Sequence, residues 1–256
     1  YRIGPFEIEN VKGDLNFKDI DFSYVKGEQV LKHFDLWVKS GQKIAIVGAT
    51  GSGKTTVVNL LTRFYDIDGG VITLDGQDIR NIPVNKLRGS IGIVLQDTVI
   101  FSDTIAQNIR YGRIDATDEE IVEAAKIARV DDFASKLSDG YNTMLTEGGS
   151  NLSQGQRQLI SIARAVLADP KILILDEATS SIDTRTEMHI QEAMVALMKG
   201  RTSLIIAHRL STIRDADKIV VISGGKVVEA GDHDELLAQK GEYYKLYQSQ
   251  FAGIAT

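Results

Sequence analysis

Residues Gly48-Ala49-Thr50-Gly51-Ser52-Gly53-Lys54-Thr55 match the phosphate-loop pattern Gly-x-x-x-x-Gly-Lys-Ser/Thr at every defined position. A short apolar run at residues 43–47 comes directly before them, as expected for a buried strand. Residues 55–64, which follow, have their apolar side chains at helical spacing. This order of strand, loop and helix is the context that the pattern requires. The sequence therefore predicts a phosphate-binding site at the start of a helix.

Each part of this loop has a chemical reason. Glycines allow the backbone to curl so that successive N–H groups point at phosphate oxygens, and the N-terminus of the helix adds the positive end of its dipole. Lys54 provides a positive charge for the β- and γ-phosphates, and the Thr55 hydroxyl is a ligand for Mg²⁺. The expected nucleotide-binding residues of this segment are Gly48, Thr50, Gly51, Ser52, Gly53, Lys54, Thr55 and Thr56.

A second apolar run, residues 172–175, ends in the two carboxylates of Asp176 and Glu177. The carboxyl ends of the strands in an open parallel sheet are where ligands bind. We therefore expect Asp176 to hold Mg²⁺ through water. Glu177 is then expected to orient and polarise the water that attacks the γ-phosphate.

The pattern of the whole chain predicts an α/β fold. Similar apolar runs occur at residues 91–95, 203–207 and 218–222, and helical patterns lie between the runs. This alternation is typical of a phosphate-loop NTPase core with a mainly parallel sheet. The alternating residues 15–24 and the turn pairs Asp75-Gly76 and Gly224-Gly225 indicate an additional antiparallel β subdomain. Residues from about 104 to 165 carry helix starts at Thr117 and Ser153, which predicts an inserted helical subdomain.

Composition removes several other classes of function. The 256 residues include no cysteine, which excludes disulfides, thiolate metal sites and cysteine nucleophiles. The net charge of −6 disfavours a nucleic-acid partner, because the phosphate backbone requires a basic surface. No apolar run approaches the ~18 residues that cross a bilayer. The first residue is Tyr1 rather than methionine, so we expect the chain to be a piece of a longer protein.

Residues Leu152-Ser153-Gln154-Gly155-Gln156 narrow the interpretation, because they closely resemble the signature motif of ATP-binding cassette proteins. The family usually has glycine where this chain has Gln154, but Ser153 and Gly155 are both present. Ser153 also begins a helix, which makes a second anion site on the same chain. The resemblance explains why one chain has two anion sites. In this family the signature of one cassette, here Ser153, Gly155 and Gln156, binds the nucleotide held by the phosphate loop of another.

The other elements of the family follow in order and assign further roles by resemblance. Tyr24 is similar to the aromatic residue that stacks on adenine. Gln96 is similar to the glutamine that contacts Mg²⁺ and the attacking water. His208 is similar to the switch histidine that holds the γ-phosphate. Ser180-Ser181-Ile182-Asp183 resembles the loop that reaches the partner cassette, with Asp183 as the contact.

The resemblance covers residues 15–251 and implies one nucleotide-binding domain over residues 1–256, with the transmembrane domain absent from this chain. Catalysis would then use Glu177, His208, Gln96 and Lys54, and Mg²⁺ would be held by Thr55, Gln96 and Asp176. Residues Thr146-Glu147-Gly148-Gly149 resemble the loop by which exporter cassettes touch their transmembrane part. The expected partners are a second cassette, identical or different, and the membrane domain of an exporter, at the cytoplasmic face of a membrane.

Other classes of protein contain a phosphate loop. Cassette ATPases of DNA repair carry a long coiled coil or a zinc insertion between the motifs, whereas the segment between Gln96 and Ser153 is short and has no cysteine. A catalytically inactive, regulatory cassette would lack Glu177 or His208. A phosphotransferase would leave the signature motif unexplained. The sequence therefore favours an ATPase cassette that drives export, and an exporter over an importer subunit.

Overall fold

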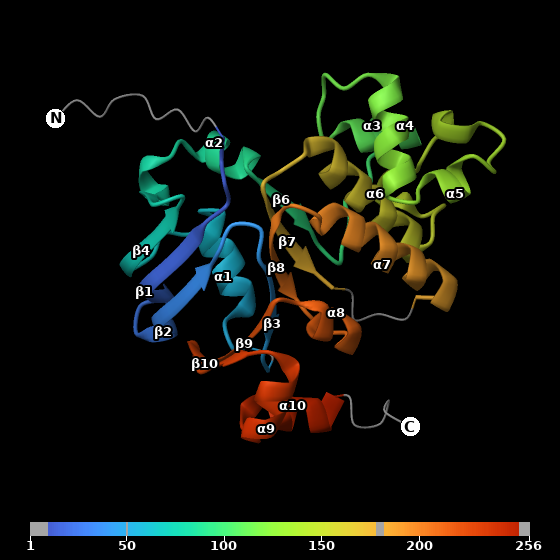
Figure 1. Cartoon of the computed structure of the whole chain (residues 1–256). Coiled ribbons are helices and arrows are strands. Elements are labelled where there is room, and N and C mark those ends of the chain that lie inside the picture. The colour runs from blue at the N-terminus through green and yellow to red at the C-terminus, as the bar shows by residue number, and fades with distance from the viewer. Residues whose placement is uncertain (1–9, 50, 178–181, 251–256) are drawn as a thin grey trace. The chain divides into compact units, whose positions relative to one another are not determined.

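The strand before the phosphate loop lies in the middle of a sheet. The computed structural model describes residues 10–49, 51–177 and 182–250 and divides into two units. The first unit comprises Tyr1–Ile91, Lys171–Glu177 and Arg201–Thr256, and the second comprises Gly92–Pro170 and Ala178–Gly200. Figure 1 shows the elements of both units in chain order.

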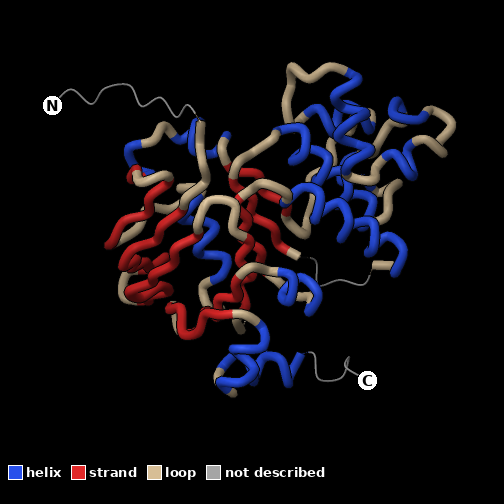
Figure 2. Tube along the Cα trace, viewed as in Figure 1, coloured by secondary structure: helices blue, strands red, loops and turns tan. Residues whose placement is uncertain are grey.

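The main sheet of the first unit is mostly parallel. β3 (Lys43–Val47) pairs in parallel with β8 (Thr202–Ile206) and with β9 (Lys218–Ser223). β7 (Ile172–Asp176) pairs in parallel with β8, and β10 (Lys226–Gly231) pairs antiparallel with β9, so the order is β10-β9-β3-β8-β7. These strands are among those drawn red in Figure 2. All residues of β8 are buried, which explains the apolar run at Leu204, Ile205 and Ile206 after the two buried polar residues Thr202 and Ser203.

A smaller antiparallel sheet lies in the same unit, with the order β2-β1-β4-β5. Its strands are β1 (Leu15–Val25), β2 (Glu28–Val38), β4 (Gly69–Leu74) and β5 (Gln77–Asp78). The turn between β4 and β5 is the predicted pair Asp75-Gly76, and both residues have positive φ, 50° and 81°. Gly224-Gly225 makes the corresponding turn between β9 and β10. Both predicted hairpins are therefore confirmed.

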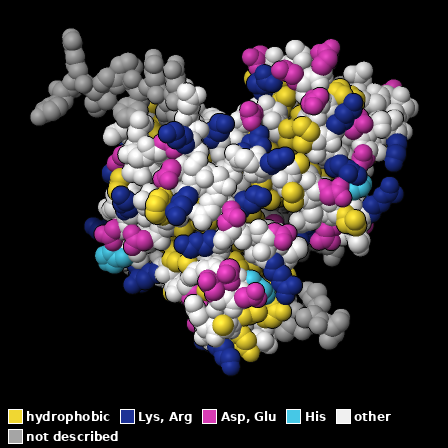
Figure 3. Space-filling model, in the orientation of Figure 1, with side chains coloured by type: hydrophobic (Ala, Val, Ile, Leu, Met, Phe, Trp, Pro, Cys, Tyr) yellow, Lys and Arg dark blue, Asp and Glu magenta, His cyan; other side chains and the backbone are white. Residues whose placement is uncertain are grey.

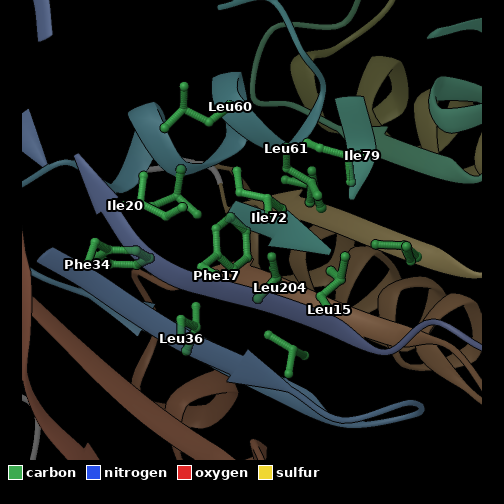
Figure 4. Close-up of a cluster of buried hydrophobic side chains, with 14 of the residues drawn as sticks. Leu15, Phe17, Ile20, Phe34, Leu36, Leu60, Leu61, Ile72, Ile79 and Leu204 are labelled. Carbon is green, nitrogen blue, oxygen red and sulfur yellow. The ribbon is translucent and has the colours of Figure 1, made fainter. Parts of the chain in front are cut away.

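One hydrophobic core joins the two sheets to α1 (Lys54–Leu61), the helix that follows the phosphate loop. Figure 4 shows Phe17 and Ile72 of the antiparallel sheet packed with Leu204 of β8 and with Leu61 of α1. These four side chains are at most 1% exposed. Since β3 and α1 are both anchored in this core, the loop that connects them has its two ends fixed.

Among its described residues, the first unit has four more helices. They are α2 (Val84–Gly89), α8 (Leu210–Asp215), α9 (His233–Gln239) and α10 (Glu242–Gln250), with a 3₁₀ turn at Ile79–Asn81. The sequence patterns above do not predict these helices. α8 begins two residues after the predicted switch residue His208, with Arg209 as its N-cap.

The second unit begins in β6 (Ile91–Val94) and is mainly helical. Its helices are α3 (Ile105–Arg110), α4 (Asp118–Ile127), α5 (Asp131–Ala134), α6 (Gln154–Ala168) and α7 (Thr184–Met198), with 3₁₀ turns at Gly140–Asn142 and Glu147–Gly149. α6 contacts α3, α4 and α7. The helix starts expected at Thr117 and Ser153 are both present as capping boxes.

Candidate functional site

The phosphate loop has the backbone conformation that its glycines permit. Gly51 and Gly53 have φ values of 79° and 110°, a region that other residues rarely adopt. Gly53 is the N-cap of α1, so the free N–H groups of the first turn of α1 begin at the loop. Ser52 N donates to Ala49 O at 3.1 Å, which closes the turn. Thr50, a predicted binding residue, lies outside the described residues.

Two groups in this loop fit a phosphate ligand. The Ser52 hydroxyl is buried, and among the described residues it has no hydrogen-bond partner. Lys54 Nζ donates to the Gly48 carbonyl at 2.6 Å, and burial lowers the pKa of Lys54 although the nearby Asp176 carboxylate opposes this effect. A buried ammonium with a lowered pKa is stabilised by any anion that comes next to it.

The acidic end of β7 lies beside the residues that follow β8. Glu177 is 4% exposed, and its carboxylate oxygen Oε2 accepts hydrogen bonds from the backbone N–H groups of His208 at 3.1 Å and Arg209 at 2.9 Å. His208 Nε2 is 3.8 Å from Asp176 Oδ1. The structure thus brings together Asp176, Glu177 and His208, which the sequence predicted from separate segments. Arg209, whose amide holds Glu177, is a contributor that the sequence analysis missed.

The ligands expected for Mg²⁺ are all oxygen donors. Thr55 offers a hydroxyl at the start of α1, and Asp176 offers a carboxylate that is 28% exposed and close enough to act on the pKa of Lys54. Mg²⁺ binds one or two such groups, keeps several waters and takes the rest of its ligands from substrate phosphates. The pair therefore fits this ion, whose positive charge would neutralise the oxygens of the bound phosphates. The third expected ligand, Gln96, lies in the second unit just after β6.

Tyr24 presents an aromatic ring at the surface next to α1. Its hydroxyl is 3.1 Å from Thr56 Oγ1 and accepts from Asn59 Nδ2 at 2.9 Å, so the hydroxyl end of the side chain is held by two residues of α1. The rings of Phe22 and Tyr65 meet it edge-on, each with a centroid distance of 4.8 Å. The ring remains 43% exposed. A fixed, exposed ring is suited to stacking on a base, and the contacts with Thr56, Asn59 and Tyr65 are not readable from the sequence.

We expect Tyr24→Ala to weaken ATP binding by ~1–3 kcal/mol, the range for a base stacked on an aromatic side chain. Tyr24→Phe is the matched control, because it keeps the ring and removes only the hydroxyl bonded to Thr56 and Asn59. Calorimetric titration of each variant with ATP measures the difference. Equal affinity of the alanine variant and the unchanged chain would remove Tyr24 from the site.

The second anion site predicted from the sequence falls at the start of α6, in the second unit. Ser153 Oγ accepts from Gln156 N at 3.1 Å, and Gln156 Oε1 accepts from Ser153 N at 3.0 Å. Gly155 has no room for a side chain, since a Cβ there would lie 2.3 Å from Thr186 Cγ2 of α7. This close contact packs the first turn of α6 against α7. The signature residues are therefore on a rigid helix end whose N-terminal dipole attracts anions.

Asp183 begins α7 as its N-cap. Its carboxylate accepts from Thr186 N at 3.0 Å, and this backbone hydrogen bond lowers the pKa of Asp183. The side chain is exposed and negatively charged at neutral pH. Its expected contact with a partner cassette remains a prediction, and Ser180 and Ser181 of the same motif lie outside the described residues.

Comparison with known proteins identifies the family. The family model described as ABC transporter matches residues 31–180. The chain is 58% identical over 93% of its length to the uncharacterized ABC transporter ATP-binding protein YfiC of Bacillus subtilis, and 51% identical over 96% to the ATP-dependent lipid A-core flippase of Syntrophus aciditrophicus. A solved structure of a bacterial Atm1-family ABC exporter with ATP bound matches the whole chain with a TM-score of 0.89 at 41% identity.

The chain spans 40% and 41% of the length of these two relatives and 46% of the solved exporter chain. Within the described residues, every helix is too short or too polar to cross a membrane. The comparisons confirm the resemblance drawn from the motifs and the predicted fold class. The chain therefore belongs to the ABC transporter family, and it is an ATP-binding domain of the kind whose ATP hydrolysis drives transport.

Proposed function

We propose that this chain hydrolyses Mg-ATP in a head-to-tail pair with a second cassette and thereby drives export through a membrane domain. The observation that carries the proposal is that one chain has two helix N-termini suited to binding an anion, at the starts of α1 and α6. A single nucleotide on a single chain requires only the first. The second is explained when Ser153 of one chain binds the phosphates held by Lys54 of another.

In this proposal the first unit of each chain carries out the chemistry. Tyr24 stacks on adenine, the loop amides and Lys54 bind the phosphates, and Thr55 and Asp176 hold the metal. Glu177 accepts a proton from the attacking water, and His208 stabilises the charge on the γ-phosphate. The bonds from the amides of His208 and Arg209 fix one oxygen of Glu177, Oε2, and so set the orientation of the carboxylate. Gln96 is proposed as a further ligand for the metal and the water.

The second cassette supplies Ser153, Gly155, Gln156 and Asp183. Because the γ-phosphate is the ligand that both chains share, its removal ends the attraction between them, and the pair opens. Each turnover would then close and open the pair once.

Two observations support the proposal of a membrane partner: the descriptions of the relatives and the surface of the second unit. The relatives include proteins described as a flippase and an exporter, and this chain spans less than half of their length. Val99, Phe101 and Tyr111 are exposed, and the rings of Phe101 and Tyr111 stack 4.2 Å apart. We propose that this apolar surface and the loop at residues 146–149 contact the membrane domain at the cytoplasmic face. Two copies of one chain and two different cassettes are both compatible with this arrangement.

The charge distribution supports a partner other than nucleic acid. Figure 3 shows Lys and Arg side chains interspersed with Asp and Glu on the face in view. The net charge of −6 agrees with this mixture. A mixed surface does not provide the basic stripe that follows a phosphate backbone.

Pairing predicts how turnover depends on protein concentration. If the paired chains are the active form, ATP turnover per chain rises with chain concentration and then reaches a plateau. A steady-state ATPase assay over a dilution series measures this dependence. Turnover per chain that stays constant over the series at saturating Mg-ATP would mean that the single chain is the active form and would contradict the proposal.

A further inference from the structure

The helix that follows the switch residue is held at both of its ends. At the N-terminal end of α8, the amides of His208 and Arg209 bind the Glu177 carboxylate. At the C-terminal end, Arg214 Nε donates to His233 Nε2 at 3.3 Å. α8 is six residues long, so these two attachments lie less than two helical turns apart.

His233 is the first residue of α9 and is fixed by α10. Its Nδ1 is 2.7 Å from the hydroxyl of Tyr243, which is 1% exposed. Because the Arg214 guanidinium can only donate, Nε2 of His233 must accept, so the proton of the neutral ring is on Nδ1 and is donated to Tyr243. The Glu229 carboxylate accepts from the amides of Glu242 and Tyr243, each at 2.8 Å, and this anchors the start of α10 to β10.

We propose that His233 is a positioning residue: its neutral ring, held between Tyr243 and Arg214, fixes α8 and so fixes the amides of His208 and Arg209 that orient Glu177. The C-terminal helices α9 and α10, which lie next to α8 in Figure 1, then act on the reaction through this helix. The inference rests on the proposed function in one respect, the role of Glu177 as the base.

Protonation of His233 would break this arrangement. The imidazolium has no acceptor for Arg214 and places a second positive charge beside the guanidinium. Burial, and then the charge of Arg214, lower the pKa of His233, so the folded chain favours the neutral ring. The titratable groups that face the ring are Arg214 on α8, Asp232 and Asp234 beside it, and Tyr243 and Tyr247 on α10.

The sign of the effect follows from the lowered pKa. At pH values between the pKa of His233 in the folded chain and its ordinary value of about 6.5, the His233 ring binds a proton more strongly in the unfolded chain than in the folded chain. The arrangement is therefore complete above that ordinary value and is lost as the pH falls through the folded pKa. In the same pH range, the hydrogen bonds from the amides of His208 and Arg209 to Glu177 should weaken.

The first test needs no nucleotide. The chain has only four histidines, so the His233 ring can be followed individually by NMR between about pH 5 and 8. We expect the amide signals of His208 and Arg209 to shift with the same midpoint as the His233 ring, and His233→Gln to abolish that shift. His33→Gln is the matched control, because His33 is an exposed histidine of the same unit, bonded to Asp19, and the shift should persist.

The second test is the rate of hydrolysis. We expect His233→Leu to lower kcat by roughly tenfold, as small displacements of catalytic groups do, with an unchanged KM for ATP. His233→Gln keeps an acceptor for Arg214 and should restore kcat at neutral pH while removing the decline of wild-type turnover on the acidic side. A leucine variant with lower thermal stability but wild-type kcat at a temperature where it is folded would mean that the cluster is only structural. The inference would also be overturned if the amide signals of His208 and Arg209 did not shift with the midpoint of the His233 titration.

These outcomes separate the inference from the proposed function. A chain that binds no ATP would contradict the proposed function, yet the NMR titration would still show whether His233 controls the backbone around Glu177. Conversely, normal ATP turnover with no coupling between His233 and those amides would reject only the inference.

Discussion

Glu177→Gln should lower the rate of ATP hydrolysis by about 10²- to 10⁴-fold, the usual contribution of a general base, while ATP binding is retained. Glutamine has the same shape and keeps an oxygen that can accept from the amides of His208 and Arg209, so the local structure survives. What is lost is the negative charge that takes the proton from water. Turnover and nucleotide affinity, measured on the same sample, separate the two effects.

The matched control is Glu123→Gln, the same substitution at an exposed position of α4. We expect its turnover to equal that of the unchanged chain. Rapid turnover by the Glu177 variant would show that another group is the base.

Lys54→Ala should have a comparably large effect, but on binding as well as on turnover. The variant loses the charge that faces the β- and γ-phosphates and the bond from Nζ to the Gly48 carbonyl, which shapes the loop. A hydrogen bond to a charged group contributes about 1.5–3 kcal/mol, so affinity for ATP should fall by at least tenfold. Loss of one group that stabilises developing charge should lower kcat by about 10²- to 10³-fold in addition.

Calorimetry with ATP and a steady-state ATPase assay measure the two losses. Lys226→Ala removes a lysine from an exposed position of β10 and should change neither. Unchanged turnover in the Lys54 variant would remove the phosphate loop from the mechanism.

Much of the fold could be predicted because burial leaves a pattern in the sequence. β3, β7 and β8 are buried on both faces, and each therefore contains an uninterrupted run of three or four apolar residues. The start of α4 was visible as a capping box and the start of α6 as an N-cap serine, and both are local features. β2 begins at Glu28, earlier than its apolar residues indicate, because its first half pairs with β1 while its side chains remain largely exposed.

The helices α8, α9 and α10 were missed for a related reason. Each has a single buried residue, respectively Ile213, Leu236 and Tyr243, so none has the apolar stripe that marks an amphipathic helix. Their stability comes from contacts with other elements, such as the bond between Arg214 and His233. Contacts of this kind join residues that are distant in the sequence, so the sequence pattern does not reveal them.

The sequence motifs named the residues of the candidate site, but the contacts between these residues could not be predicted. Motifs identified Asp176, Glu177 and His208, although 31 residues separate Glu177 from His208. Only the structure shows that Glu177 is held by backbone amides. The catalytic and binding roles assigned to all of these residues, and to Gln96, Ser153 and Asp183, remain predictions.

The mass of the Glu177→Gln chain with and without Mg-ATP tests the shared nucleotide most directly. Light scattering should give the 28.1-kDa mass of one chain without nucleotide and twice that mass with saturating Mg-ATP. Adding Ser153→Arg to the same chain should abolish the doubling, because the second anion site is then blocked. A Glu177 variant that binds Mg-ATP tightly and still has the mass of one chain would contradict the account.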